Sequence, residues 1–289
     1  MKILFIFTEG PHDVAFIKLV LELCFNIHHE QHAKIADFPK PLDSIFFQLM
    51  KNHAMGDLSL DMVHKFFLPN YVFRTDFFFI MLFNTGGMKN YINVKKLLSQ
   101  IIQQIKTDDK SFLFTEKDMK FLFTYDVDYR TIEERIEEMS NTIFPITEND
   151  AFPENKDVQE INPKILLNKD MNSVAFYIWT NRSKQGTLED ILFDIYYLTS
   201  SKLLQASETF VNTYFSEKFV FTEEITKHNI AVRSDKEKAC LTVAGQGERP
   251  SRPLTAIIED NVLSDRESFI SNTNVIAFKN FLCERFDIK

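Results

Sequence analysis

Cysteine, glycine and long apolar runs are all scarce in this chain of 289 residues. The three cysteines, Cys24, Cys240 and Cys283, are an odd number without the spacing of metal ligands. This excludes a disulfide scaffold and predicts reduced thiols in a cytoplasmic protein. No apolar run approaches the roughly 18 residues of a transmembrane helix, so we expect no membrane partner. The first apolar run, residues 2–8, is too short for a signal peptide and is typical of a strand.

Positive charge is also in short supply. Lys and Arg total 33 against 41 Asp and Glu, which gives a formal net charge of −8. This balance excludes a polybasic protein of the histone kind, so any binding of nucleic acid has to come from a local basic patch. The hydrophobic fraction of 45% is that of an ordinary globular protein, and a chain of this length can bury a sizeable core.

What the sequence does contain is an alternation of strand-like and helix-like segments. Four apolar runs, of the kind found in strands buried on both faces, are each followed by turn residues and a helical pattern. These runs are residues 2–8, 76–83, 120–126 and 173–180. Repeated strand–helix units favour right-handed crossovers, so we predict an α/β fold with a sheet of about four parallel strands and flanking helices.

The remaining segments predict how the chain is organised. We expect an α/β domain over residues 1–200, with a helical insertion at about 26–75 and a loop at 145–171. Residues 201–289 are expected to form a mostly helical C-terminal extension. Within this extension, glycines, prolines and arginines at 244–253 predict a basic loop that would complete a site at the edge of the sheet.

Acidic side chains follow three of the four predicted strands. Together with one threonine, the candidates are Glu9, Asp13, Asp126, Asp128, Thr187 and Glu189. The carboxyl ends of parallel strands meet at one edge of a sheet, where ligands bind, so we expect these side chains to converge. Asp126 and Asp128 would project to the same side if the third strand extended through both residues.

A group of carboxylates is costly unless something compensates its charge. Two of them about 4 Å apart repel by roughly 4 kcal/mol at an effective dielectric constant of about 20, which requires a cation or raised pKa values. Oxygen ligands favour hard ions such as Mg²⁺ or Mn²⁺, and two such ions about 4 Å apart suit in-line cleavage of a phosphodiester. Each acidic motif alone also has a structural explanation, as a solvated turn or as a helix cap followed by acidic residues.

Three motifs resemble those of a known family. Residues 9–13, Glu-Gly-Pro-His-Asp, resemble the first motif of Toprim domains, and residues 126–128, Asp-Val-Asp, resemble their Asp-x-Asp motif. Residues 186–189, Gly-Thr-Leu-Glu, are similar to the Ser/Thr-x-Glu motif of the OLD nucleases, which also have a lysine further downstream. The resemblance covers roughly residues 1–25 and 76–245.

The resemblance implies a Toprim-like domain in which the insertion accounts for the long separation of the first two motifs. The chain has no Walker A motif, whereas OLD proteins carry an ATPase domain, so it is similar to a stand-alone OLD-like Toprim protein. The function implied is Mg²⁺- or Mn²⁺-dependent hydrolysis of phosphodiester bonds in DNA or RNA, within phage defence or repair. The resemblance also leaves open that the chain works with a separate ATPase subunit and that it forms a homo-oligomer.

The resemblance also implies roles for single residues. Glu9 and Asp126 would hold a first metal ion, and Glu9 would act as the general acid or base. The second of two ions would be held by Asp13, Asp128, Glu189 and Thr187. Lys236 and Lys238 are the candidates for the downstream lysine, which would neutralise charge on the phosphate in the transition state. Lys238, followed by Ala and a Leu-Thr segment, fits the family pattern better.

Basic residues between 227 and 252 give the acidic chain a local positive excess, and the glycines and prolines there predict a loop rather than a helix. The candidates for binding nucleic acid are Arg233, Lys236, Arg249 and Arg252. A basic loop beside a metal site would bind the phosphate backbone, although an ordinary solvated loop explains the same residues.

Two other functions fit the same motifs. A Toprim-like fold can serve as a non-catalytic scaffold subunit that docks to an ATPase or toxin partner. A phosphotransferase or phosphatase that acts on small phosphate compounds would use the same acidic ligands. The full set of acidic positions favours the nuclease, and assays of the isolated chain on nucleic acids and nucleotides would separate the three.

Overall fold

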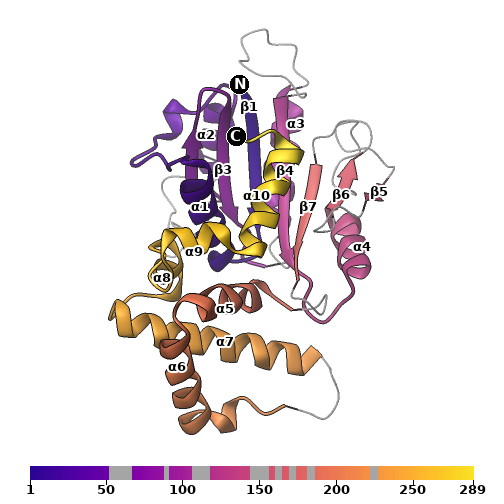
Figure 1. Ribbon diagram of the computed structural model, residues 1–289. Helices are drawn as coiled ribbons and strands as arrows, with labels where there is room; N and C mark the ends of the chain where they lie inside the picture. The colour runs from indigo at the N-terminus through magenta and orange to yellow at the C-terminus, as the bar shows by residue number, and fades with distance from the viewer. Residues whose placement is uncertain are drawn as a thin grey trace.

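A single mixed sheet with helices on both faces forms the body of the protein (Figure 1). The computed structural model describes residues 1–51, 67–87, 91–105, 118–143, 156–159, 165–168, 174–180, 186–221 and 227–289. The sheet has the strand order β2-β3-β1-β4-β7-β6-β5.

The four central strands of the sheet are parallel, as the sequence predicts. They are β3 (Phe78–Asn84), β1 (Lys2–Thr8), β4 (Met119–Asp126) and β7 (Val174–Trp179). Leu4 and Ile6 of β1 pack in the hydrophobic cluster on one face, and Phe5 and Phe7 pack in the cluster on the other. Because both faces are covered, the strand is a continuous apolar run rather than an alternating one.

Three short antiparallel strands at the sheet edges are absent from the sequence prediction. β2 (Tyr71–Arg74) pairs with β3, so the insertion predicted as helical at 26–75 ends in a strand. β6 (Ile165–Asn168) pairs with β7, and β5 (Lys156–Gln159) pairs with β6, within the segment predicted as a loop. Each of these strands has four residues, too few to show a period in the sequence.

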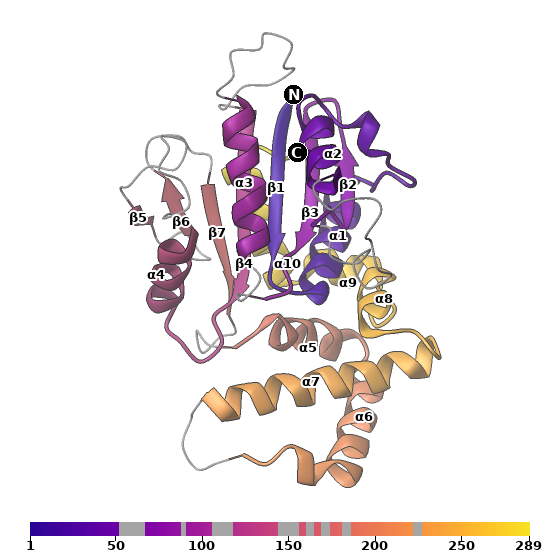
Figure 2. The ribbon, with the colours of Figure 1, turned by 180° about the vertical axis from the view of Figure 1, so that it is seen from behind.

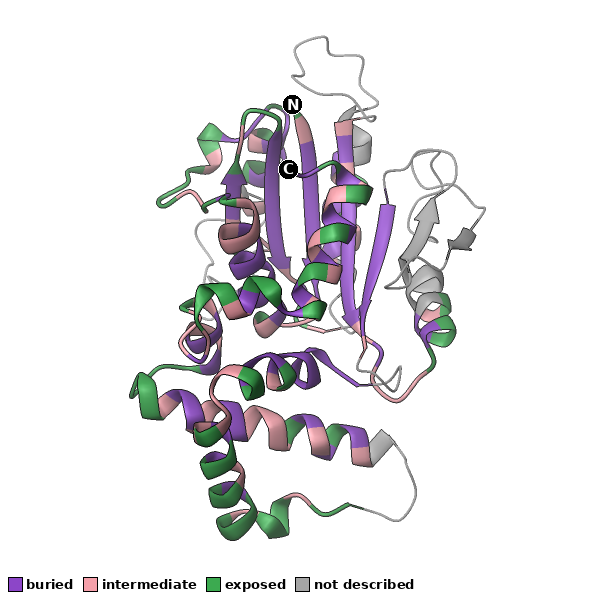
Figure 3. Cartoon of the chain, in the orientation of Figure 1, coloured by how far each residue is buried: buried purple, intermediate pink, exposed green. Residues whose placement is uncertain are grey.

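Helices cover the two faces of the sheet. One face carries α1 (Pro11–Phe25) together with three C-terminal helices, as Figure 1 shows. These are α8 (Leu254–Glu259), α9 (Arg266–Ser271) and α10 (Thr273–Phe286). The opposite face carries α2 (Leu42–Lys51) and α3 (Tyr91–Ile105) (Figure 2). Helix α4 (Ile132–Ile143) follows β4 in the chain. Figure 3 shows that the central strands, between the two layers of helices, are buried.

Phenylalanine dominates the second face of the sheet. The rings of Phe7 and Phe83 stack with centroids 5.1 Å apart, as do those of Phe7 and Phe123 and those of Phe5 and Phe121. Each fully buried ring of this kind contributes about 1.5–3 kcal/mol relative to an exposed one. The abundant phenylalanines therefore stabilise the sheet that holds the strand ends in place.

Further helices lie beyond the carboxyl ends of the parallel strands (Figures 1 and 2). They are α5 (Leu188–Thr199), α6 (Ser201–Tyr214), the short η6 (Ser216–Lys218) and α7 (Lys227–Glu248). No helix in the described part of the chain combines the length and apolar character that a membrane crossing requires.

The prediction of a loop rather than a helix across the basic segment 227–252 is wrong over most of its length, because α7 runs from Lys227 to Glu248. Of the glycine- and proline-rich residues 244–253, those after Glu248 lie outside the helix. Gly245 lies inside the helix, where a Cβ atom would come within 2.1 Å of Cδ1 of Ile257 in α8. This glycine therefore permits a close approach of two helices and does not mark a turn.

Replacing Gly245 tests this close approach. We expect Gly245→Ala to lower the free energy of unfolding by about 1–3 kcal/mol, because the buried Ile257 side chain has to move. In Gly247→Ala, the new Cβ meets only the end of the Leu203 side chain, at 3.2 Å. That control should be neutral or should stabilise the helix by up to about 1 kcal/mol. Urea unfolding of the two variants measures the difference, and equal stabilities would contradict the packing.

Candidate active site at the carboxyl ends of the strands

The turn between β1 and α1 places the first two acidic candidates. Gly10 precedes the helix in an extended conformation, and Pro11 occupies the first helical turn. The Gly10 amide donates to Asp13 Oδ2 at 3.1 Å, and the Trp179 indole N–H donates to Asp13 Oδ1 at 2.8 Å. Asp13 is buried, and this burial raises its pKa well above the usual value, with the charges of Glu9 and Glu189 adding to the effect.

Asp126 connects the ends of three chain segments. Its backbone amide donates to Glu9 Oε2 at 3.3 Å, and its Oδ1 accepts from the amide of Leu188 at 2.7 Å. Burial raises the pKa of Asp126 well above its usual range, and the charges of Asp13 and Glu189 raise it further. Burial also raises the pKa of Glu9, although the nearby Arg135 guanidinium opposes this shift. The structure thus brings these predicted carboxylates into one electrostatic group.

Asp128 does not continue the strand as expected. Its φ of 55° is left-handed, and its backbone forms an antiparallel bridge with Gly186, with N···O distances of 2.8 and 2.9 Å. Asp126 and Asp128 therefore do not project as alternate residues of one extended strand. The Asp128 carboxylate instead accepts a hydrogen bond from Arg135, a residue of α4 that is only 1% exposed.

Thr187 and Glu189 begin α5, after the end of β7. Thr187 is the N-cap, and its amide donates to Asp190 Oδ2 at 2.8 Å. Glu189 is 4% exposed, and its Oε1 lies 2.8 Å from His12 Nδ1. The capping explanation is therefore correct for Thr187, and the same turn also aims Glu189 at the acidic group.

Helix α7 contributes two residues to the site from outside the sheet. Ser234 donates to Glu189 Oε2 and accepts from the Thr187 hydroxyl, both at 3.3 Å. Lys238 lies one helical turn further along, with Nζ 3.6 Å from Glu189 Oε1. Although burial raises the pKa of Glu189, the His12 hydrogen bond and the Lys238 charge outweigh it and hold this pKa below its usual value. Lys236 is two residues from Ser234, so it projects from the other side of the helix.

The predicted basic residues do not form one patch. Arg233 pairs with Asp190 through Nε–Oδ1 and Nη2–Oδ2 distances of 2.8 and 3.1 Å. Arg249 follows Lys238 by 11 residues, which corresponds to about 16 Å along a helix. Its Nη1 lies 3.9 Å from Asp260 Oδ2. Arg252 is exposed beyond the end of α7. The structure therefore places Arg233 next to the acidic group but leaves Arg249 and Arg252 at the far end of the helix.

Several residues of the site escape the sequence analysis as site residues. They are His12, Arg135, Trp179 and Ser234. The four-residue spacing of Ser234 and Lys238 is a signal that could have indicated a shared helix face, had the helix been predicted. No pattern pairs Arg135 with Asp128, because an arginine in a charged helix is ordinarily solvated.

The described residues contain no three carboxylate, imidazole or thiolate groups that converge into a ready-made metal site. Mg²⁺ does not require one, since it commonly keeps several waters and binds one or two carboxylates. Glu9 and Asp126 offer hard oxygen donors, and the Asp126 backbone amide connects the two residues. The pKa values of both carboxyl groups are raised by burial and by neighbouring carboxylates. This donor chemistry fits Mg²⁺ or Mn²⁺.

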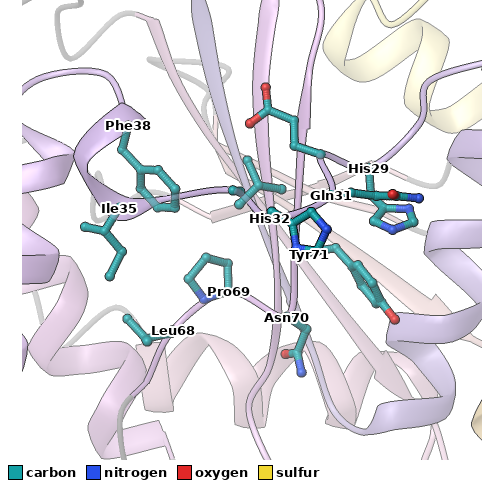
Figure 4. A pocket seen from close by; sticks show the side chains of 12 residues that line it. His29, Gln31, His32, Ile35, Phe38, Leu68, Pro69, Asn70 and Tyr71 are labelled. Carbon is teal, nitrogen blue, oxygen red and sulfur yellow. The ribbon is translucent and has the colours of Figure 1, made fainter.

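A separate cavity of 560 Å³ lies between the chain after α1 and the start of β2 (Figure 4). His29, His32, Phe38, Leu68 and Tyr71 are among the side chains that line it. None of the predicted site residues does so. The acidic group is therefore the candidate active site, and this cavity is not part of it.

Comparison with known proteins does not assign the chain to a family. No family model matches it, and no curated protein matches it. A solved structure, a hypothetical protein from Pyrococcus horikoshii OT3, aligns over 99% of this chain and 96% of its own, with 15% identity and a TM-score of 0.44. Both values are too low for the likeness to bear on function.

Glu237 of α7 offers a test of the electrostatics beside the site. Burial and the charge of Asp190 raise the pKa of Glu237 to about 8, while Arg233 opposes the shift. A raised folded-state pKa means that stability is highest below the unfolded value of about 4.5 and is lost as the pH rises to about 8.

We therefore expect Glu237→Gln to increase the free energy of unfolding at pH 8.5 by roughly 1–2 kcal/mol, and to change it little at pH 4.5. Urea unfolding across this range measures the effect. The exposed Asp235→Asn, on the same helix, should follow the wild-type curve. A gain that is the same at both pH values would contradict the assigned cause.

Proposed function

We propose that this chain is a metal-dependent nuclease of the Toprim type, OLD-like, that hydrolyses phosphodiester bonds of DNA or RNA with Mg²⁺. The observation that carries the proposal is the junction of three strand ends at Asp126. This residue donates its amide to Glu9 after β1 and accepts from Leu188 after β7. The residues joined there are those that resemble the Toprim motifs.

Charge supports a cation at this junction. Glu9 and Asp126 lie among Asp13, Asp128 and Glu189, and each neighbouring carboxylate makes ionisation of the others less favourable. A divalent ion removes this repulsion. When bound, Mg²⁺ supplies Lewis-acid stabilisation of phosphate oxygens and makes a bound water more acidic.

The chain's own residues supply the remaining chemistry. Glu9 has a raised pKa, so it can exchange a proton closer to neutral pH than an ordinary carboxylate. The ammonium group of Lys238 is held beside the acidic group by Glu189 and is partly exposed, so it can contact a phosphate oxygen and stabilise charge that develops there.

The substrate is proposed to be a polymer rather than a small phosphate compound. Arg249 and Arg252 follow the C-terminal end of α7, and Arg249 is about 16 Å along the helix axis from Lys238. At about 3.4 Å per nucleotide, that distance corresponds to roughly five nucleotides of one strand. Lys236 and Arg233 would contact the backbone nearer the site. A role in phage defence or repair, with a separate ATPase, follows from the OLD resemblance.

Conservative substitutions of the two central carboxylates test the activity. Glu9→Gln and Asp126→Asn keep the size of each side chain but remove its charge, so each should lower Mg²⁺-dependent cleavage at least about 100-fold. The assay follows supercoiled DNA, single-stranded DNA, RNA and nucleotides in parallel, with Asp235→Asn as control. Cleavage of nucleotides alone would favour the phosphatase, and an inactive wild-type chain would favour the scaffold.

The two lysines separate chemistry from binding. Lys238→Ala should lower kcat by roughly 100-fold, because it removes a cation that acts on the transition state. Lys236→Ala, from the other side of α7, should raise KM by a few-fold at constant kcat, because it removes only a backbone contact. Steady-state kinetics at saturating Mg²⁺ measure both, and the reverse pattern would assign the catalytic role to Lys236.

A further inference from the structure

Side-chain cations of this chain already pair with carboxylates that the family resemblance assigns to a second metal ion. Asp128 accepts from Arg135, which also donates to Glu138 at 3.0 Å. The Arg135 side chain is almost fully buried, and it lies between these two carboxylates. A metal ion at Asp128 would have to displace a buried guanidinium and leave its charge poorly compensated.

The carboxylate of Glu189 also has side-chain partners within the protein. Its Oε1 is 2.8 Å from His12 Nδ1 and 3.6 Å from Lys238 Nζ, and its Oε2 accepts from Ser234. These partners come from α1 and α7, so two helices hold this carboxylate in place. Both oxygens of Glu189 thus have donors supplied by the protein.

Asp13 is satisfied without a metal as well. Its Oδ2 accepts from the Gly10 amide, and its Oδ1 accepts from the Trp179 indole. The Trp179 ring is 1% exposed and packs with its centroid 5.5 Å from that of Phe16. Because this packing fixes the indole N–H, Asp13 is not free to turn toward an ion.

Glu9 and Asp126 differ from these three carboxylates. The donors to them are backbone amides, from Asp126 to Glu9 Oε2 and from Leu188 to Asp126 Oδ1. Among the described residues, no lysine or arginine forms an ion pair with either carboxylate. Within that part of the chain, these two carboxylates have no direct side-chain cation partner, although the charge of Arg135 acts on Glu9 from its place beside Asp128.

We propose that the site binds a single divalent cation, at Glu9 and Asp126, and that Arg135 takes the place of the second ion at Asp128. Lys238 compensates the charge of Glu189 in the same manner, and the His12 imidazole contacts the same carboxylate. The inference rests on the proposed function for the location of the ion, and it departs from the two ions that the family resemblance implies. Cleavage would then depend on one metal ion together with fixed cations of the chain.

Counting bound Mn²⁺ tests this proposal without an activity assay. Mn²⁺ is titrated into the full chain, and the free ion is measured by electron paramagnetic resonance. We expect one Mn²⁺ per wild-type chain. Asp126→Asn should weaken its binding at least about tenfold, whereas Asp128→Asn should leave stoichiometry and affinity within about threefold of wild type. Two ions per wild-type chain, no ion at all, or loss of the ion in Asp128→Asn would each overturn the proposal.

A substitution of Arg135 tests the same proposal from the other side, because it leaves Asp128 without its cation. Arg135→Gln removes the cation from Asp128 and should allow a second Mn²⁺ to bind, provided that circular dichroism shows a folded chain. If it does not fold, the Asp126→Asn and Asp128→Asn comparison decides the question. A folded Arg135→Gln chain that still binds one ion would contradict the role given to Arg135.

The result separates this proposal from the proposed function. One bound Mn²⁺ in a chain that cleaves no nucleic acid would refute the nuclease and keep the single-ion site. Cleavage by a chain that binds two Mn²⁺ would support the nuclease and refute the single-ion site.

Discussion

Parallel pairing of β1, β4 and β7 is the constraint on which the candidate site depends. Thr8 of β1 is in register with Thr124 of β4, and Asp126 of β4 is in register with Trp179 of β7. The acidic residues that follow these strands are therefore brought to one edge by backbone hydrogen bonds and not by any attraction between their side chains. Their repulsion is a cost that the apolar core on both faces of the sheet offsets.

The core and the site are connected through Trp179. Its ring lies with its centroid 4.6 Å from that of Tyr177 and 5.0 Å from that of Phe278 in α10, while its N–H donates to Asp13. The C-terminal helix thus packs on the same indole that holds a site carboxylate. A change in the packing of α10 would therefore move the indole N–H that donates to Asp13, since a buried aromatic ring cannot shift without its neighbours.

The sequence was sufficient for the elements whose pattern is long. Four buried strands of six to eight residues were predicted because each is an apolar run bounded by turn residues. The edge strands are too short for such a pattern. Helix α7 was predicted as a loop because its glycines are typical of turns, whereas in the structure Gly245 permits a close helix crossing. For the site, the acidic positions could be predicted because they follow strands. Their partners could not, because Arg135 and Ser234 come from helices that contact the site only after folding.

This difference between carboxylates and their partners bears on how many metal ions such a site holds. Acidic motifs report where negative charge gathers, but the number of ions depends on the charge that is left after the chain's own cations are counted. Here Arg135 and Lys238 lie outside the acidic motifs, on α4 and α7, and each pairs with a carboxylate of the group. Glu9 and Asp126 are held by backbone amides, which satisfy lone pairs but bring no unit charge. In the proposed single-ion site, the charge left for an external cation is therefore concentrated at the end of β1 and the end of β4.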